Sequence, residues 1–134
     1  MNNKIEENKL EILFNQIKDQ LLLLRNNLVS KYGEDNLYGK CIEASDEVLL
    51  ILKNFNIKAK SVEGWCVYDD ASSCSNDPYD AHTWVEAIIN DKTYMFDVTL
   101  TQFSFFMNDP IDPVIIGQVP YFLVYDKPSG FDYE

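Results

Sequence analysis

Apolar residues recur every three or four positions over the first 30 residues of the chain. Between residues 4 and 29 they form a single stripe: Ile5, Leu10, Leu13, Phe14, Ile17, Leu21, Leu24 and Leu28. This spacing predicts a long amphipathic helix with one buried face. Gly33 is a suitable stop signal beyond it. Because no side chain here points to chemistry, we interpret the helix as scaffold.

A second stripe begins at Cys41, after a predicted loop at residues 33–40. The stripe continues at three-and-four spacing through Ala44, Ser45, Val48, Leu52 and Phe55. It predicts a helix from Cys41 to about Asn54, with the thiol at the N-terminal end of the core-facing side. In the alternative, Ser45 is the N-cap and Cys41 lies in the preceding loop. We prefer the longer helix.

Four later segments have the composition or alternation of strands: residues 57–68, 83–90, 93–99 and 121–125. Gly64 marks a bulge or a point of close approach within the first of them. Polar, turn-rich residues at 69–80 predict a long surface loop. Two helices followed by several strands predict an α+β fold, with the N-terminal helices packed on an antiparallel sheet.

The turn between the second and third strands decides which side chains meet. If it is centred on Asn90-Asp91, His82 faces Thr99 and is diagonal to Asp97, within side-chain reach. Centring the turn on Asp91-Lys92 separates His82 and Asp97 unless a bulge intervenes. A site that uses His82 and Asp97 together requires the first register.

Composition narrows the class of protein. A length of 134 residues predicts one domain, spanning residues 1–134, with 46% hydrophobic and 25% charged residues as in ordinary globular proteins. The net charge of −11 argues against nucleic-acid binding, which needs clustered Lys and Arg. The apolar runs are too short to span a bilayer, so we expect no membrane partner.

Three cysteines without metal-ligand spacing predict neither a disulfide framework nor a metal site. The acidic N-terminus does not resemble a secretory signal, so we expect a cytoplasmic protein. Cys66 and Cys74 have no base nearby in the pattern, and we treat both as structural or incidental.

The candidate chemistry lies in Cys41, His82 and Asp97. A thiolate is a nucleophile, an imidazole is a base for it, and a carboxylate behind the imidazole fixes its tautomer. His82 is the only histidine of the chain. Each residue alone also has a structural explanation, since buried cysteines, lone histidines and strand-end aspartates are common in proteins without activity.

Three short segments contain these residues: Gly39-Lys40-Cys41, His82-Thr83-Trp84-Val85-Glu86-Ala87 and Tyr94-Met95-Phe96-Asp97-Val98-Thr99. Together they resemble the transglutaminase-like superfamily, whose fold is a circularly related version of the papain fold. The resemblance covers about residues 36–100, and Val98 stands where many members have proline. It implies a papain/transglutaminase-like core, in which Cys41 is the nucleophile, His82 the base and then acid, and Asp97 the orienting carboxylate.

The resemblance further implies action on an amide of a peptide or protein substrate, without a metal or organic cofactor. No glutamine lies shortly before Cys41 to act as a papain-type oxyanion donor, so Asn36, Tyr38 or the Cys41 backbone N–H are the candidates. Trp84 is expected to pack over the His-Asp pair and exclude water, or to be a core aromatic. We assign Asn36, Tyr38 and Trp84 to the substrate-binding part of the site.

Several functions are compatible with such a site. The acyl group on Cys41 would pass to water, as in a peptidase or glutamine deamidase, or to an amine, as in a transglutaminase. The alternative is a catalytically inactive module of the same fold that binds peptides or proteins. A toxin-like effector is also compatible with the chain, which is too short for an arylamine acetyltransferase. The oligomeric state stays open.

Overall fold

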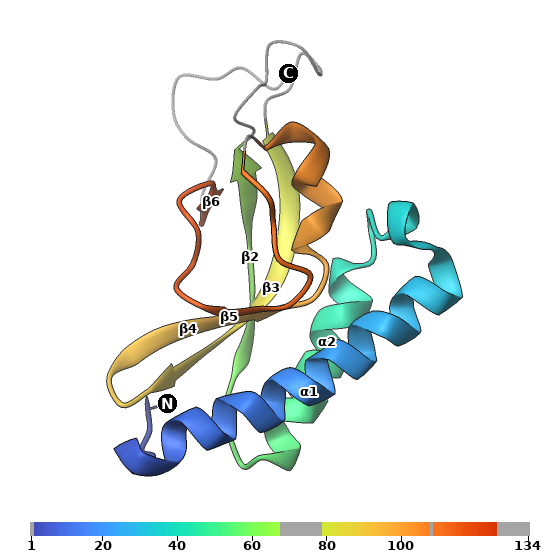
Figure 1. The fold of residues 1–134 in the computed structure, drawn as a ribbon. Coiled ribbons are helices and arrows are strands. Elements are labelled where there is room, and N and C mark those ends of the chain that lie inside the picture. Colours follow the sequence, from blue (N-terminus) through green and yellow to red (C-terminus); the bar gives the residue numbers. More distant parts are fainter. Residues whose placement is uncertain (1, 68–78, 108, 126–134) are drawn as a thin grey trace.

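The computed structural model describes residues 2–67, 79–107 and 109–125, and these form two helices packed against a curled sheet. The helices α1 (Glu7–Tyr32) and α2 (Cys41–Asn54) lie together on one side of the sheet (Figure 1). The predicted α+β class with N-terminal helices on a mainly antiparallel sheet is therefore confirmed.

Helix α1 lies three residues further along the chain than predicted. Residues 2–3 form a short strand, β1 (Asn2–Asn3), and the backbone stays extended through Glu6, so the helix begins later. Its end follows the predicted signal: Gly33 adopts φ 90° and donates its N–H to the Val29 carbonyl at 2.8 Å. A short 3₁₀ turn, η1 (Glu34–Asn36), follows.

Helix α2 has the predicted bounds. The alternative start at Ser45 is wrong, because Ser45 lies one turn inside the helix and is buried. Its hydroxyl donates to the Thr83 carbonyl at 3.2 Å, which fixes the first turns of α2 against the sheet. Cys41 is the first residue of this helix.

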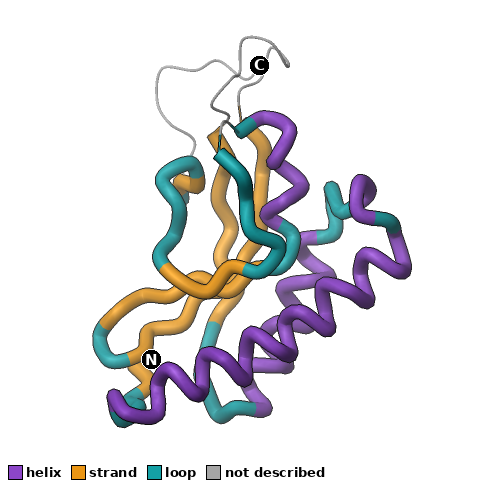
Figure 2. Tube along the Cα trace, in the orientation of Figure 1, coloured by secondary structure: helices purple, strands orange, loops and turns teal. Residues whose placement is uncertain are grey.

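The described residues form a six-stranded sheet with the order β5-β4-β3-β2-β6, with β1 beside β3. Its long strands are β2 (Lys60–Val67), β3 (Tyr79–Ile89) and β4 (Lys92–Asp97), and its short ones are β5 (Ile115–Gly117) and β6 (Leu123–Val124). All pairs are antiparallel except the parallel pair of β1 and β3. Figure 2 shows how the strands curl beside the two helices.

The register that the site hypothesis requires is confirmed. Val85 pairs with Phe96 and Ile89 with Lys92, so the β3–β4 turn is centred on Asn90-Asp91. Both turn residues have positive φ, 51° and 67°, which is the geometry of a type I′ hairpin turn.

Other strand boundaries differ from the sequence-based expectation. Strand β3 begins at Tyr79, inside the predicted loop, because it pairs with β2 as far as Val67. The expected strand at 121–125 is limited to Leu123–Val124. The aromatic segment after Asp97 forms a 3₁₀ helix, η3 (Leu100–Phe106). Most of the expected 69–80 loop lies outside the described residues.

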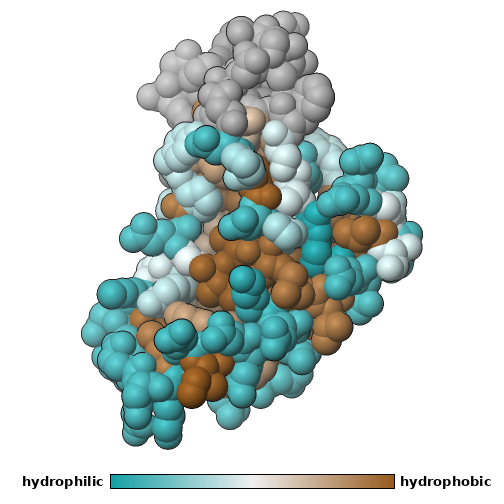
Figure 3. All heavy atoms as spheres, in the orientation of Figure 1, coloured by the Kyte–Doolittle hydropathy of each residue, from teal (hydrophilic) through white to brown (hydrophobic). Residues whose placement is uncertain are grey.

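The two faces of the sheet bury separate apolar clusters. Side chains of β3 alternate, so that Val85, Ala87 and Ile89 pack towards the helices. Trp84 packs on the opposite face, with Met95 and Phe103. Apolar side chains also gather at the middle of the face in Figure 3, with hydrophilic ones around them. Among the described residues, no helix has the length and apolar content needed to cross a bilayer.

Candidate functional site

The three residues predicted to form a nucleophilic site come together from three elements. Cys41 begins α2, His82 lies in the first half of β3, and Asp97 ends β4. His82 and Asp97 are buried, with 1% and 2% of their surfaces exposed, whereas Cys41 is half-buried. A ligand therefore reaches the thiol before the other two groups.

Asp97 holds one side of the His82 ring. The ring Nε2–H donates to Asp97 Oδ2 at 2.5 Å. The other carboxylate oxygen accepts from the Thr99 backbone N–H at 3.1 Å and from the Thr99 hydroxyl at 3.2 Å. These bonds fix the carboxylate, and the carboxylate in turn fixes the imidazole.

The Cys41 thiol interacts with His82 and with Thr83 through hydrogen bonds. Burial opposes ionisation of the thiol. The hydrogen bond and charge of His82 and the bonds from Thr83 outweigh that effect, so the pKa of Cys41 is lowered overall. A lowered pKa is the property that a nucleophilic cysteine needs.

The protonation of His82 shifts in the complementary direction. Burial by itself lowers the pKa of the imidazole, but the Asp97 charge, the Asp97 hydrogen bond and Cys41 together raise it to about 9. The electrostatics of this site therefore favour the thiolate–imidazolium form of the pair.

Two aromatic rings enclose His82. Trp84 stacks on the ring at a centroid distance of 5.9 Å, and Phe103 meets it edge-on at 5.2 Å. The predicted packing of Trp84 on the His-Asp pair agrees with this geometry. Its assignment to substrate binding does not, because the indole is 0% exposed and its N–H donates to Glu86 Oε2 at 2.8 Å.

Gly64 allows this packing. It pairs with His82 across β2 and β3, and a Cβ atom there would lie 2.3 Å from the Val124 carbonyl oxygen and 2.5 Å from the Trp84 ring. The expectation that Gly64 marks a point of close approach is therefore confirmed. Any larger residue would force β6 or the indole away.

A buried cation from α1 supports the segment that follows Asp97. The guanidinium of Arg25 donates to the Val98 carbonyl at 2.8 Å and to the Thr101 hydroxyl at 2.5 Å, and it pairs with Glu34 at 3.5 Å. Its side chain is 4% exposed. Arg25 thus ties the scaffold helix to the segment that joins β4 to η3.

Gln102 is a site residue that the sequence did not indicate. Its side-chain Nε2 lies 3.1 Å from His82 Nδ1, and its Oε1 accepts the Gly39 backbone N–H at 3.3 Å. Gln102 lies in η3 (Leu100–Phe106). A 3₁₀ turn there brings residue 102 over the site, and the hydrophobic pattern carries no signal for that turn.

The two side chains proposed as oxyanion donors have other partners. The Asn36 side-chain amide donates to the Tyr32 carbonyl at 2.9 Å and so caps the end of α1. The Tyr38 hydroxyl donates to the Asp80 carboxylate at 2.7 Å. Asn36 therefore caps a helix in this structure, and its assignment to substrate binding stays a prediction. Tyr38 lies near the site through Asp80, two residues before His82, but its hydroxyl proton is already used.

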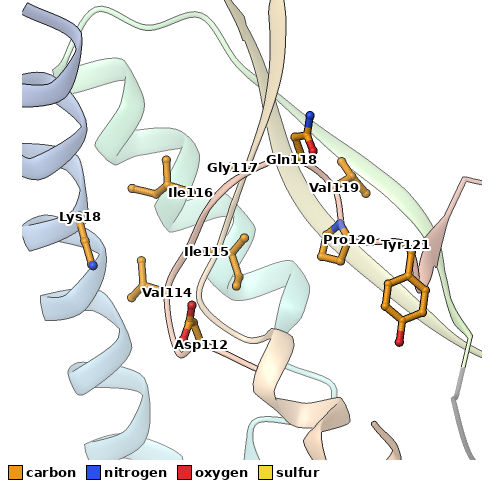
Figure 4. A pocket seen from close by; sticks show the side chains of 10 residues that line it. All are labelled: Lys18, Asp112, Val114, Ile115, Ile116, Gly117, Gln118, Val119, Pro120 and Tyr121. Carbon is orange, nitrogen blue, oxygen red and sulfur yellow. The ribbon is translucent and has the colours of Figure 1, made fainter. Parts of the chain in front are cut away.

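A cavity of about 360 Å³ opens beside His82. It is lined by residues of β2 and β3 and by Tyr125: Glu63, Gly64, Trp65, Ala81, His82, Thr83 and Tyr125. A second cavity, of about 540 Å³, lies between Lys18 of α1 and residues 112–121 (Figure 4). The second cavity includes none of Cys41, His82 and Asp97 in its lining.

Of the two remaining cysteines, the structure describes only Cys66. Cys66 is buried in the apolar cluster that contains Trp84 and Phe103, and Cys74 lies outside the described residues. Within the described ranges, no group of three or more His, Cys, Asp and Glu side chains is arranged to hold a metal ion.

No family model, curated protein or solved structure matches this chain.

Proposed function

We propose that this protein is a cysteine-nucleophile enzyme of the transglutaminase-like, papain-related type, acting on an amide of a peptide or protein. Cys41 is the nucleophile, His82 the base and then acid, and Asp97 the orienting carboxylate. The observation that carries the proposal is the setting of His82, whose ring has a buried carboxylate on one nitrogen and also interacts with the half-buried Cys41 thiol.

The reaction would proceed in two acyl-transfer steps. The Cys41 thiolate attacks the amide carbon, a C–S bond forms, and the carbonyl oxygen becomes an oxyanion. Collapse of this intermediate breaks the C–N bond, and the imidazolium of His82 gives its proton to the leaving amine. Water or a primary amine then attacks the acyl-enzyme while His82 takes its proton, which releases the product and the thiol.

A cavity beside His82 lies along β2 and β3, and its lining includes His82 but not Cys41. Its volume of about 360 Å³ is within the range of sites for small ligands or single side chains. The aromatic ring of Trp65 and the carboxylate of Glu63 give it both apolar and polar lining.

Turnover on amides tests the proposal. The protein is incubated with a mixture of glutamine-containing peptides, with and without a fluorescent primary amine. Ammonia release, amine incorporation and peptide cleavage are then measured. We expect one of these products from the wild type and a loss of about a thousandfold or more in Cys41→Ala. Cys66→Ala is the matched control and should retain activity.

The outcomes separate the proposal from the inactive-module alternative. Product formation that depends on Cys41 supports the enzyme. Peptide binding without any product, unchanged in Cys41→Ala, contradicts the enzyme and supports the module.

A further inference from the structure

The side chain of Gln102 bridges the backbone before Cys41 and the ring of His82. The Gly39 N–H lies 3.3 Å from Gln102 Oε1, and Gln102 Nε2 lies 3.1 Å from His82 Nδ1. Gly39 is two residues before the nucleophile. The bridge therefore joins η3 to the residues just before α2.

The chemistry of the partners fixes the direction of each hydrogen bond. A backbone N–H only donates, so the amide oxygen of Gln102 belongs at Gly39 and the amide nitrogen at His82. An amide nitrogen also only donates, so His82 Nδ1 must be an acceptor without a proton. On the other side of the ring, the Asp97 carboxylate accepts from Nε2. The whole chain of bonds is satisfied by one form of His82, the neutral ring with its proton on Nε2.

This arrangement competes with ionisation of Cys41. To take the thiol proton, His82 must use the Nδ1 lone pair that accepts from Gln102. Once Nδ1 carries a proton, the Gln102 N–H can no longer donate to it, and the bond from Gln102 to His82 is lost. The bridge therefore stabilises the neutral pair of Cys41 and His82 over the charged pair.

We propose that Gln102 is a positioning residue that favours the neutral, Nε2-protonated tautomer of His82, against the effect of Asp97, and so restrains formation of the Cys41 thiolate. This inference rests on the proposed function, because it concerns the residue assigned as the base. A hydrogen bond has a net value that corresponds to about a two- to tenfold change in an equilibrium. Gln102 should therefore shift the balance of the two forms by about that factor.

Other charged and titratable side chains contact His82 or the residues near it and must stay constant in a test. They come from four elements: Cys41 of α2, Asp97 of β4, Arg25 of α1, and Asp80 and Glu86 of β3 itself. Asp97 and Cys41 act on His82 directly, whereas Arg25 acts through Asp97. Gln102→Met leaves all five unchanged and keeps the size of the side chain while removing the amide.

The rate of Cys41 alkylation by iodoacetamide measures the thiolate population without knowledge of a substrate. It is followed from about pH 5 to about pH 9 by peptide mapping. Below the apparent pKa of the thiol, Gln102→Met should label Cys41 about two- to tenfold faster than wild type. Gln20→Met, at an exposed glutamine of α1, should match wild type. Gln102→Ala, which adds no new apolar bulk, should change the rate in the same direction as Gln102→Met.

Nitrogen NMR gives a second readout that a purely structural role would not produce. His82 is the only histidine, so ¹⁵N-labelled histidine reports this ring alone. At equal pH, Gln102→Met should contain more imidazolium than wild type. Unchanged or slower alkylation together with an unchanged imidazolium fraction would overturn the inference. If His82→Gln also leaves wild-type Cys41 reactivity unchanged, the proposed function fails as well. If that variant lowers the reactivity, only the role of Gln102 fails.

Discussion

At the scale of single residues, the protonation of His82 determines what the site does. Its pKa is raised to about 9, and the carboxylate of Asp97 contributes both charge and a hydrogen bond to that shift. The charged ring stabilises the thiolate form of Cys41 and so lowers the pKa of the thiol. Asp97 therefore acts on the nucleophile through the ring between them.

Replacing Asp97 by Asn should reverse this effect. The amide keeps the shape of the carboxylate but not its charge, so the pKa of His82 should fall from about 9 towards its ordinary value of 6.5. Between these two pH values the ring then loses its proton and the Cys41 thiolate loses its counter-ion. We expect alkylation of Cys41 at neutral pH to slow about tenfold or more.

The measurement is the ¹⁵N NMR titration of His82 combined with the alkylation rate. Asp46→Asn, at an exposed position of α2, is the matched control and should leave both unchanged. A ring in Asp97→Asn that still titrates near pH 9 would show that the carboxylate is not the source of the shift.

The sequence allowed part of this site to be predicted at residue level. A single histidine and the register of a two-residue hairpin turn were enough to bring His82 and Asp97 together. Gln102 could not be predicted as a site residue, because its position depends on a 3₁₀ turn whose residues follow no periodic pattern. The capping role of Asn36 could not be predicted either, because it depends on where α1 ends.

At the scale of elements, close packing between β2, β3 and β6 supports the ring of His82. Gly64→Ala should reduce the free energy of unfolding by about 1–3 kcal/mol, because the new methyl group would meet the Val124 carbonyl oxygen and the Trp84 ring. Gly117→Ala is a matched control in the same sheet, since nothing lies within 4 Å of the added atom.

Denaturant unfolding of both variants measures the difference. The Gly117 variant should lie within about 0.5 kcal/mol of wild type. Equal stabilities for the two alanine variants would contradict the close approach at Gly64.

The contact of α1 with the segment after β4 gives another prediction. Arg25→Met removes donors from the Val98 carbonyl and the Thr101 hydroxyl, both near Asp97. Leaving a buried carbonyl without its partner should cost about 1–3 kcal/mol of unfolding free energy. Lys18→Met, at an exposed position of the same helix, should cost little. Thermal unfolding checks the pair, and an Arg25 variant as stable as the Lys18 variant would rule out this anchoring role.

Hydrophobic spacing predicted the long elements well. It identified both helices and the β3–β4 hairpin, because their apolar residues have clear periods of 3.6 and 2. It missed β1 and β5, which contain two and three residues and are strands only because longer strands pair with them. The start of α1 shifted for the same reason, since β1 keeps the preceding residues extended.

At the scale of the whole molecule, the sheet separates two apolar clusters, and the unfolding of each can be followed by a different spectroscopic signal. Far-ultraviolet circular dichroism follows mainly α1 and α2 on one face. Tryptophan fluorescence follows Trp65 on β2 and Trp84, which is buried in the cluster on the other face. A single cooperative domain predicts that both signals change at the same denaturant concentration. Two separate transitions would contradict the single-domain prediction.

The most direct test of the central claim is the pH dependence of Cys41 alkylation in wild type and in His82→Gln. The account predicts that wild-type Cys41 reacts with an apparent pKa below that of an ordinary thiol and faster than buried Cys66. In His82→Gln the pKa of Cys41 should return to or above its ordinary value. A wild-type Cys41 that is inert, or that has the same pKa with and without His82, would contradict the account.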